Sequence, residues 1–232
     1  INHMAWFTQL THNGEDMYPK VFKAFEDKDI YEKDWVRLEI MKHFGYFCTE
    51  STRHCYEYVA HFCHNEENRK KMRRPIIEDD NYIPEWYEDM GIKKSDAKSL
   101  ELIHSKEFAA GIIEAKLTNV GYKFYGNTIN RGMIENFHNG CCVEVPCLAD
   151  RHGIHPCHID PLPEQCAALC RTNINMQELA VKAIRNRSKE TAFHALALDP
   201  AVCATMNIDD ARQLFEELWK LESDMGLLEE YR

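Results

Sequence analysis

The chain has 232 residues, of which 44% are hydrophobic and 28% are charged, so its composition is that of an ordinary globular domain. The formal net charge of −10 argues against a nucleic-acid-binding groove, because such a groove needs clustered lysine and arginine side chains. No apolar run approaches the ~20 residues that span a bilayer, and no secretory signal is visible. We therefore expect neither a nucleic-acid nor a membrane partner.

The first half of the chain contains two helical patterns. Val36, Ile40 and Phe44 recur at a spacing of four, and Gly45 follows as a left-handed helix cap. A second helix is predicted over residues 99–117, whose apolar residues line one face. Between these helices the sequence is charged and contains prolines, which is typical of loops and solvated surface.

Residues 127–148 are the most strand-like part of the sequence. Val143-Glu144-Val145 alternates apolar and polar residues, which is the period of a half-buried strand. Pro146 is expected to end that strand, and Asn139-Gly140 to form a hairpin turn. The pattern predicts two or three short antiparallel strands.

The remainder of the chain is predicted to be helical. Asn175, Ser188 and Asn207 each precede a helical pattern and are expected to serve as N-caps. The last of these helices is expected to bury one stripe of side chains, namely Ala211, Leu214, Phe215, Leu218 and Leu221. The predicted fold class is therefore α+β: mostly helical, with a small antiparallel sheet.

Ten cysteines are present, and none belongs to a C-x-x-C pair. Cys141 and Cys142 are adjacent, which suits neither a tetrahedral zinc site nor an ordinary disulfide. We therefore expect reduced, structural thiols in a cytoplasmic protein. The sequence also lacks both glycine-rich phosphate-binding patterns, so any dinucleotide fingerprint must lie outside this chain.

Residues 46–58 concentrate ionisable groups, hydroxyls and aromatic rings, as expected for a polar pocket with stacking walls. Together with several other stretches, this segment resembles the C-terminal part of the family 4 glycoside hydrolases, in their α-galactosidase branch. The resemblance rests mainly on Ile1-Asn2-His3, Gly45-Tyr46-Phe47, Thr49-Glu50-Ser51, Glu57-Tyr58, residues 127–132, Cys141 to Pro146, and Arg171-Thr172-Asn173-Ile174-Asn175.

The resemblance implies an unusual route for cleaving an α-glycoside, one that departs from the two-carboxylate scheme of most glycosidases. The sugar is oxidised at C3 with NAD as hydride acceptor, which acidifies the C2 proton. A base removes that proton, the glycosidic oxygen is eliminated, water adds and the ketone is reduced again. A divalent metal, typically Mn²⁺, holds the sugar oxygens as a Lewis acid.

The resemblance also implies roles for individual residues. His3 corresponds to a metal-binding imidazole, with Asn2 as a substrate or outer-sphere contact. Tyr58, Glu50 and His54 are the candidates for the C2 base, and Tyr58 is preferred although a phenol would need a nearby cation to act at neutral pH. The residues expected to reach sugar hydroxyls are Asn130, Arg131 and Asn136, together with Asn2.

The whole chain, residues 1–232, is thus expected to be the substrate- and metal-binding half of a lactate/malate-dehydrogenase-like enzyme whose Rossmann half is absent. The isolated chain is expected to lack turnover, and the full-length protein to form a dimer or tetramer. An alternative is a catalytically inert fragment that acts only in binding or oligomerisation. A self-contained zinc hydrolase has no supporting H-E-x-x-H spacing.

Overall fold

The computed structural model describes residues 4–72 and 107–231. Asn2, His3 and the first part of the helix predicted over residues 99–117 lie outside the described residues. In chain order the elements are β1 (Trp6–Phe7), β2 (Thr11–His12), β3 (Glu15–Asp16), α1 (Tyr18–Phe22), the 3₁₀ turn η1 (Lys23–Glu26), α2 (Lys28–Phe44), β4 (Phe47–Cys48), α3 (Thr52–Tyr58), η2 (Ala60–Phe62), α4 (Glu66–Met72), α6 (Ala109–Thr118), β5 (Tyr122–Ile129), β6 (Cys142–Asp150), β7 (Gly153–Pro156), α7 (Glu164–Asn186), α8 (Lys189–Ala197), α9 (Pro200–Thr205) and α10 (Ile208–Asp224).

Helix α2 forms as its sequence predicts. Asp27 caps its start by accepting hydrogen bonds from the backbone N–H groups of Asp29 and Ile30. Val36 and Ile40 are buried in the core, and Gly45 ends the helix with a φ of 83°. The left-handed backbone at this position costs glycine nothing and most other residues about 1 kcal/mol or more. The end of the helix therefore fixes the position at which β4 begins.

The main sheet is antiparallel, in the order β5-β6-β7. Two details of the prediction are wrong. Strand β6 continues through Pro146, which pairs with Tyr125 of β5 but lies beyond the end of β7, so the missing N–H is tolerated at an edge. Asn139-Gly140 is not a two-residue hairpin turn, because residues 130–141 form one longer connection between β5 and β6.

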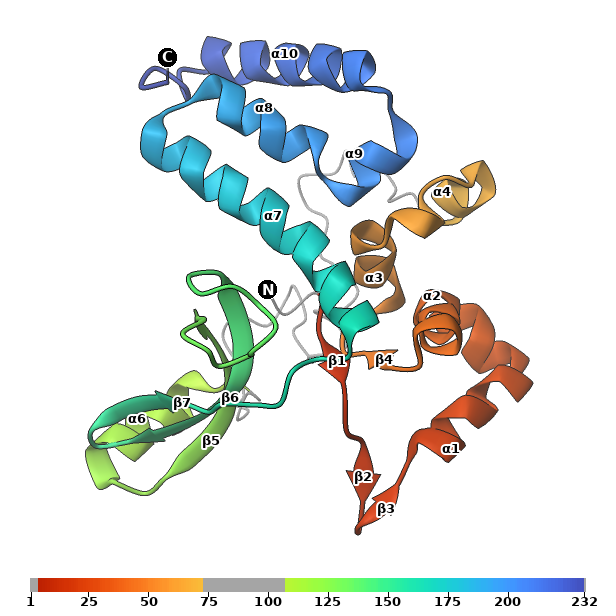
Figure 1. The fold of residues 1–232 in the computed structure, drawn as a ribbon, viewed down its shortest axis with the longest axis vertical. Helices are drawn as coiled ribbons and strands as arrows, with labels where there is room; N and C mark the ends of the chain where they lie inside the picture. Colours follow the sequence, from red (N-terminus) through yellow and green to blue (C-terminus); the bar gives the residue numbers. More distant parts are fainter. Residues whose placement is uncertain (1–3, 73–106, 232) are drawn as a thin grey trace, which may run out of the picture.

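Helix α7 runs from the neighbourhood of β1 to the C-terminal helices (Figure 1). Its N-terminal end lies beside β1, where the Trp6 indole N–H donates to the Cys170 Sγ over 3.4 Å. Its C-terminal part packs on α8. The predicted N-cap Asn175 is wrong: the helix begins at Glu164 and passes through Asn175 without interruption. Tertiary packing along α7 overrides the weak local preference of asparagine for a cap.

After α7 the chain turns back: α8 packs on α7, α10 packs on α8, and α9 contacts α3 and η2 (Figure 1). Ser188 and Asn207 cap α8 and α10 as predicted, by accepting backbone N–H groups of the first turns. The predicted stripe on α10 is only partly right. Phe215 is buried, but Leu218 and Leu221 are exposed, because α8 covers only one side of the amphipathic helix.

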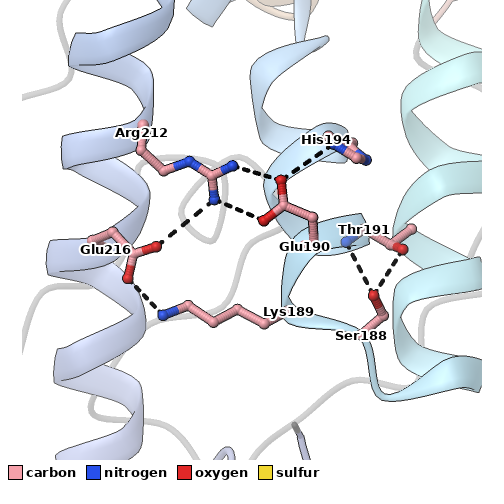
Figure 2. A network of polar contacts seen from close by, with 7 residues as sticks. All are labelled: Ser188, Lys189, Glu190, Thr191, His194, Arg212 and Glu216. Atoms are coloured by element: carbon pink, nitrogen blue, oxygen red, sulfur yellow. Dashed lines mark hydrogen bonds and ion pairs between the residues drawn. The ribbon is translucent and has the colours of Figure 1, made fainter.

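A polar network fastens α10 to α8 (Figure 2). Arg212 of α10 donates to both carboxylate oxygens of Glu190 on α8, at 3.0 and 2.6 Å, in the bidentate geometry that guanidinium groups favour. The same hydrogen bonds lower the pKa of Glu190. A second ion pair has the charges reversed between the helices: Lys189 of α8 contacts Glu216 of α10. Because these groups are exposed, the network sets the register of the two helices more than it stabilises them.

The fold class is confirmed: the described residues are mostly helical and contain small antiparallel sheets. All ten cysteines are free thiols, as expected, and seven of them are buried. Burial raises the pKa of the Cys166 thiol to about 12, which is typical of an inert structural cysteine. None of the helices in the described ranges is both long and apolar enough to cross a membrane.

Replacing Gly111 by alanine is expected to lower the free energy of unfolding by about 1–3 kcal/mol, as overpacking does elsewhere. A Cβ at this position of α6 would lie 2.4 Å from the Tyr122 ring, which also stacks on Phe124. Urea titration of G111A measures the effect. In the Tyr122→Ala background the same change should become neutral or stabilising, since alanine favours helix. Equal losses in both backgrounds would refute the contact.

Candidate functional site

One large cavity, of about 1330 Å³, lies where β1, the segment after β4, β6, the 158–163 connection and α7 meet. Its wall is part apolar and aromatic and part polar. The lining residues that bear on its chemistry are Trp6, Tyr46, Glu50, Tyr58, Tyr125, Glu144, His158, Asp160, Asn173 and Gln177. Aromatic surfaces combined with a few polar groups are typical of a small-molecule site.

Strand pairing brings the separate predicted stretches to this cavity. Trp6 of β1 pairs with Cys48 of β4, and the Thr49 backbone N–H donates to the Ala5 carbonyl over 3.0 Å. The N-terminal segment therefore lies beside Thr49-Glu50-Ser51, as the sequence interpretation requires. Met4 and Ala5 line the cavity, directly after the predicted ligand His3, which itself is not described.

The three candidate bases are close together in sequence but not equivalent in position. Glu50 and Tyr58 line the cavity, whereas His54 is not among the lining residues. His54 instead contacts Glu50, with 2.6 Å between its Nδ1 and the carboxylate Oε2. Ser51 caps α3, which begins at Thr52, and one further turn of this helix separates His54 from Tyr58.

Tyr58 is half-buried, and its surroundings oppose ionisation. Burial is the main cause that raises its pKa, and the nearby carboxylates of Glu57, Asp199 and Glu50 raise it further. At neutral pH the phenol is therefore protonated in this arrangement of groups. A cation at the cavity would act in the opposite direction and stabilise the phenolate.

Asn130 is fully buried, and its amide is saturated by the loop between β5 and β6. Its Nδ2 donates to the carbonyls of Ile134, Phe137 and His138, and its Oδ1 accepts the Ile134 N–H over 3.1 Å. The side chain thus organises the loop that carries Ile134 and Phe137 into the cavity wall. In this structure it faces backbone rather than a sugar.

The other two residues predicted to contact sugar lie away from the cavity lining. Asn136 exchanges two hydrogen bonds with the Leu162 backbone, at 2.8 and 3.1 Å, and so fixes the 158–163 wall. Arg131 lies within the β5–β6 loop, is exposed and is not among the described lining residues. The structure therefore brings Glu50 and Tyr58 together in one cavity. Asn130 and Asn136 instead hold the backbone of the cavity wall in place.

Sequence reasoning missed the polar groups that α7 contributes, Asn173 and Gln177. The signal was present in the Arg171-Thr172-Asn173-Ile174-Asn175 run, which is unusually polar for a helix interior. The N-cap predicted at Asn175 divides that run, so its helical periodicity is not apparent from the prediction. In the continuous helix, Cys170, Asn173 and Gln177 fall on one face toward the cavity.

The donor set was tested for a divalent metal. Among residues 4–72 and 107–231 no group of three or more His, Cys, Asp or Glu side chains is arranged to hold an ion. Glu50 and His54 are in contact with each other. The described residues on their own therefore do not make a manganese site.

Residues 1–202 match the family described as Family 4 glycosyl hydrolase C-terminal domain. The chain belongs to this family. Its curated relatives include the alpha-galactosidase of Bacillus subtilis (strain 168), 37% identical over 238 residues that cover 100% of this chain and 55% of the relative. The alpha-galactosidase of Rhizobium meliloti (strain 1021) is 28% identical, over 94% of this chain and 48% of its own length. The chain thus spans about half the length of the family 4 relatives that it matches.

Solved structures share the fold. A 6-phospho-alpha-glucosidase from gut microorganisms, in complex with NAD and glucose-6-phosphate, aligns with a TM-score of 0.69 at 18% identity, over 99% of this chain and 55% of that one. A 6-phospho-beta glucosidase from Thermotoga maritima, with manganese, NAD+ and glucose-6-phosphate, aligns with a TM-score of 0.65 at 21% identity, over 96% and 50%. At these identities the likeness establishes the family 4 fold alone.

Proposed function

We propose that the chain is the substrate-binding half of a family 4 glycosidase that hydrolyses α-galactosides by the redox route. The observation that carries the proposal is the cavity in which Glu50 and Tyr58 meet the segment that follows His3. The alpha-galactosidases of Bacillus subtilis and Rhizobium meliloti support the choice of sugar. When bound, NAD supplies the hydride acceptor, and a divalent metal, typically Mn²⁺, supplies Lewis-acid stabilisation of the sugar oxygens.

This chain contributes placement and proton transfer. The aromatic rings of Trp6 and Tyr46 offer apolar faces against which a sugar ring can stack. Tyr58 removes the C2 proton as the general base, and the negatively charged Glu50 carboxylate lies in the same cavity wall. Burial and the neighbouring carboxylates raise the pKa of Tyr58 and keep the phenol protonated. Tyr58 therefore needs a cation at the cavity in order to act as a base.

The remaining expectations form part of the same proposal. His3 is the metal ligand from this half, with Asn2 beside it, and Asn130, Arg131 and Asn136 set the shape of the sugar site. The full-length protein works as a cytoplasmic homo-oligomer, a dimer or tetramer. The NAD-binding Rossmann domain completes the cavity from the other side, which accounts for a volume larger than most small-molecule sites require.

The test is an assay of the full-length gene product with 4-nitrophenyl α-galactoside. We expect turnover that is lost when NAD is omitted or when divalent metal is removed with a chelator, and that returns when Mn²⁺ is added. The 232-residue chain alone should show no turnover under the same conditions. Activity that is indifferent to both additives would refute the redox route. An inactive full-length protein would favour the binding-module alternative.

A further inference from the structure

The inner face of α7 places a carboxamide at the cavity that the proposed chemistry does not yet use. Cys170, Asn173, Ile174 and Gln177 line the cavity at the i, i+3, i+4, i+7 spacing of one helical face. Cys170 is engaged by β1, since its Sγ accepts from the Trp6 indole and donates to the Met4 carbonyl. Two carboxamides remain on this face, and of these Asn173 is buried whereas Gln177 is partly exposed.

Asn173 has half of its hydrogen-bonding capacity unused. Its side chain is 3% exposed, and its Nδ2 donates to the Leu169 carbonyl one turn earlier, over 3.1 Å, and to the Thr172 hydroxyl. Its Oδ1 is buried and has no hydrogen-bond partner among the described residues. Exchanging the two amide atoms would bring Oδ1 against the Leu169 carbonyl, so the Nδ2 bond fixes this orientation.

A buried acceptor without a partner is uncommon in folded proteins and costs about 1–3 kcal/mol. Leucine has a similar size and would fill the same place in the helix without that cost. Asparagine at this position is thus explained by a donor that arrives with a ligand. We propose that the Asn173 Oδ1 accepts a hydrogen bond from a hydroxyl of the bound sugar, which makes Asn173 a specificity-determining residue of the site. The inference rests on the proposed function for the class of ligand.

The surroundings of Asn173 favour a neutral sugar over a phosphorylated or uronic one. Asp160 places a carboxylate in the lining of the same cavity, and its negative charge disfavours an anionic ligand. If the group that faces Oδ1 is an ionised phosphate or carboxylate, it offers only acceptors and cannot satisfy Oδ1, whereas a hydroxyl at that position donates. Because the Asn173 Oδ1 is buried, the proposal includes a side-chain rearrangement in the cavity wall when the sugar binds, as is common at binding sites.

The experiment measures binding of methyl α-galactoside to the full-length gene product by isothermal titration calorimetry, without turnover. Asn173→Leu is expected to weaken binding about tenfold while the Tm stays unchanged or rises, because a buried unpaired acceptor is removed. Galactose 6-phosphate is expected to bind the unaltered protein more weakly than methyl α-galactoside does. The difference in affinity between the two ligands should be smaller in N173L. A purely structural asparagine predicts the opposite pattern, in which the Tm falls and the affinity is retained.

Asn175→Leu is the matched control, since Asn175 belongs to the same run but is exposed on the other side of α7. It should bind methyl α-galactoside like the unaltered protein. Unchanged affinity in N173L would overturn the inference while leaving the proposed function intact. Binding that depends on Asn173 in a protein without turnover would do the reverse. If methyl α-galactoside does not bind the unaltered protein, both are wrong.

Discussion

Replacing Tyr58 by phenylalanine in the full-length gene product is expected to lower kcat for α-galactoside cleavage by about 10²–10⁴-fold, the usual contribution of a positioned general base. The change removes the hydroxyl and retains the ring, so the cavity wall and α3 stay in place. KM should change little, because the lost interaction is one made in the transition state. Steady-state kinetics with 4-nitrophenyl α-galactoside, NAD and Mn²⁺ measure the effect.

Tyr56→Phe provides the matched control, since Tyr56 lies on the same helix but is not among the residues lining the cavity. It should retain nearly full activity. A Tyr58→Phe enzyme as active as this control would contradict the assignment of the base. Glu50, the other candidate in the wall, would then be the residue to replace, and His54 would act through its contact with Glu50.

Replacing Asn130 by aspartate is expected to lower the free energy of unfolding by about 3–5 kcal/mol, the range for an uncompensated buried charge. The native Nδ2 donates to three carbonyl groups of the β5–β6 loop. In the variant an acceptor oxygen faces these carbonyls inside the core. Domains are stable by only about 5–15 kcal/mol, so the loss is severe. Urea titration followed by circular dichroism measures it.

Asn139→Asp is the control for this experiment, because Asn139 lies in the same loop and is exposed. Its stability should stay within about 0.5 kcal/mol of the unaltered protein, as for most surface changes. If N130D were as stable as N139D, Asn130 would not be the organising residue of the loop. If N130D folded normally but lost affinity for methyl α-galactoside, Asn130 would regain its predicted role as a sugar contact.

The parts of the fold that follow local rules could be predicted from the sequence. Gly45 and the caps Ser188 and Asn207 depend on a few neighbouring residues, and all three take the predicted roles. The prediction for Asn175 also used only neighbouring residues, and it is wrong because distant contacts decide where α7 begins. Its cap would cost the continuity of α7, and the packing of that helix on β1 and α8 is worth more than one local hydrogen bond.

The site was predictable only as far as family resemblance and chain proximity reach. Glu50 and Tyr58 do line one cavity, but the burial of Asn130 depends on how a 12-residue connection folds back on itself, which no short pattern encodes. Asn173 was missed because its orientation follows from a helix that begins at Glu164, well before the predicted N-cap Asn175. A single boundary error thus hid the polar residue that faces the site.

The most direct test of the redox account is to run the full-length gene product with an α-galactoside in D₂O and examine the released galactose by proton NMR. Removal of the C2 proton by a base, followed by return of a solvent proton, predicts deuterium at C2 in the product. Hydrolysis through paired carboxylates never breaks that C–H bond. Galactose that retains its original C2 hydrogen would contradict the account.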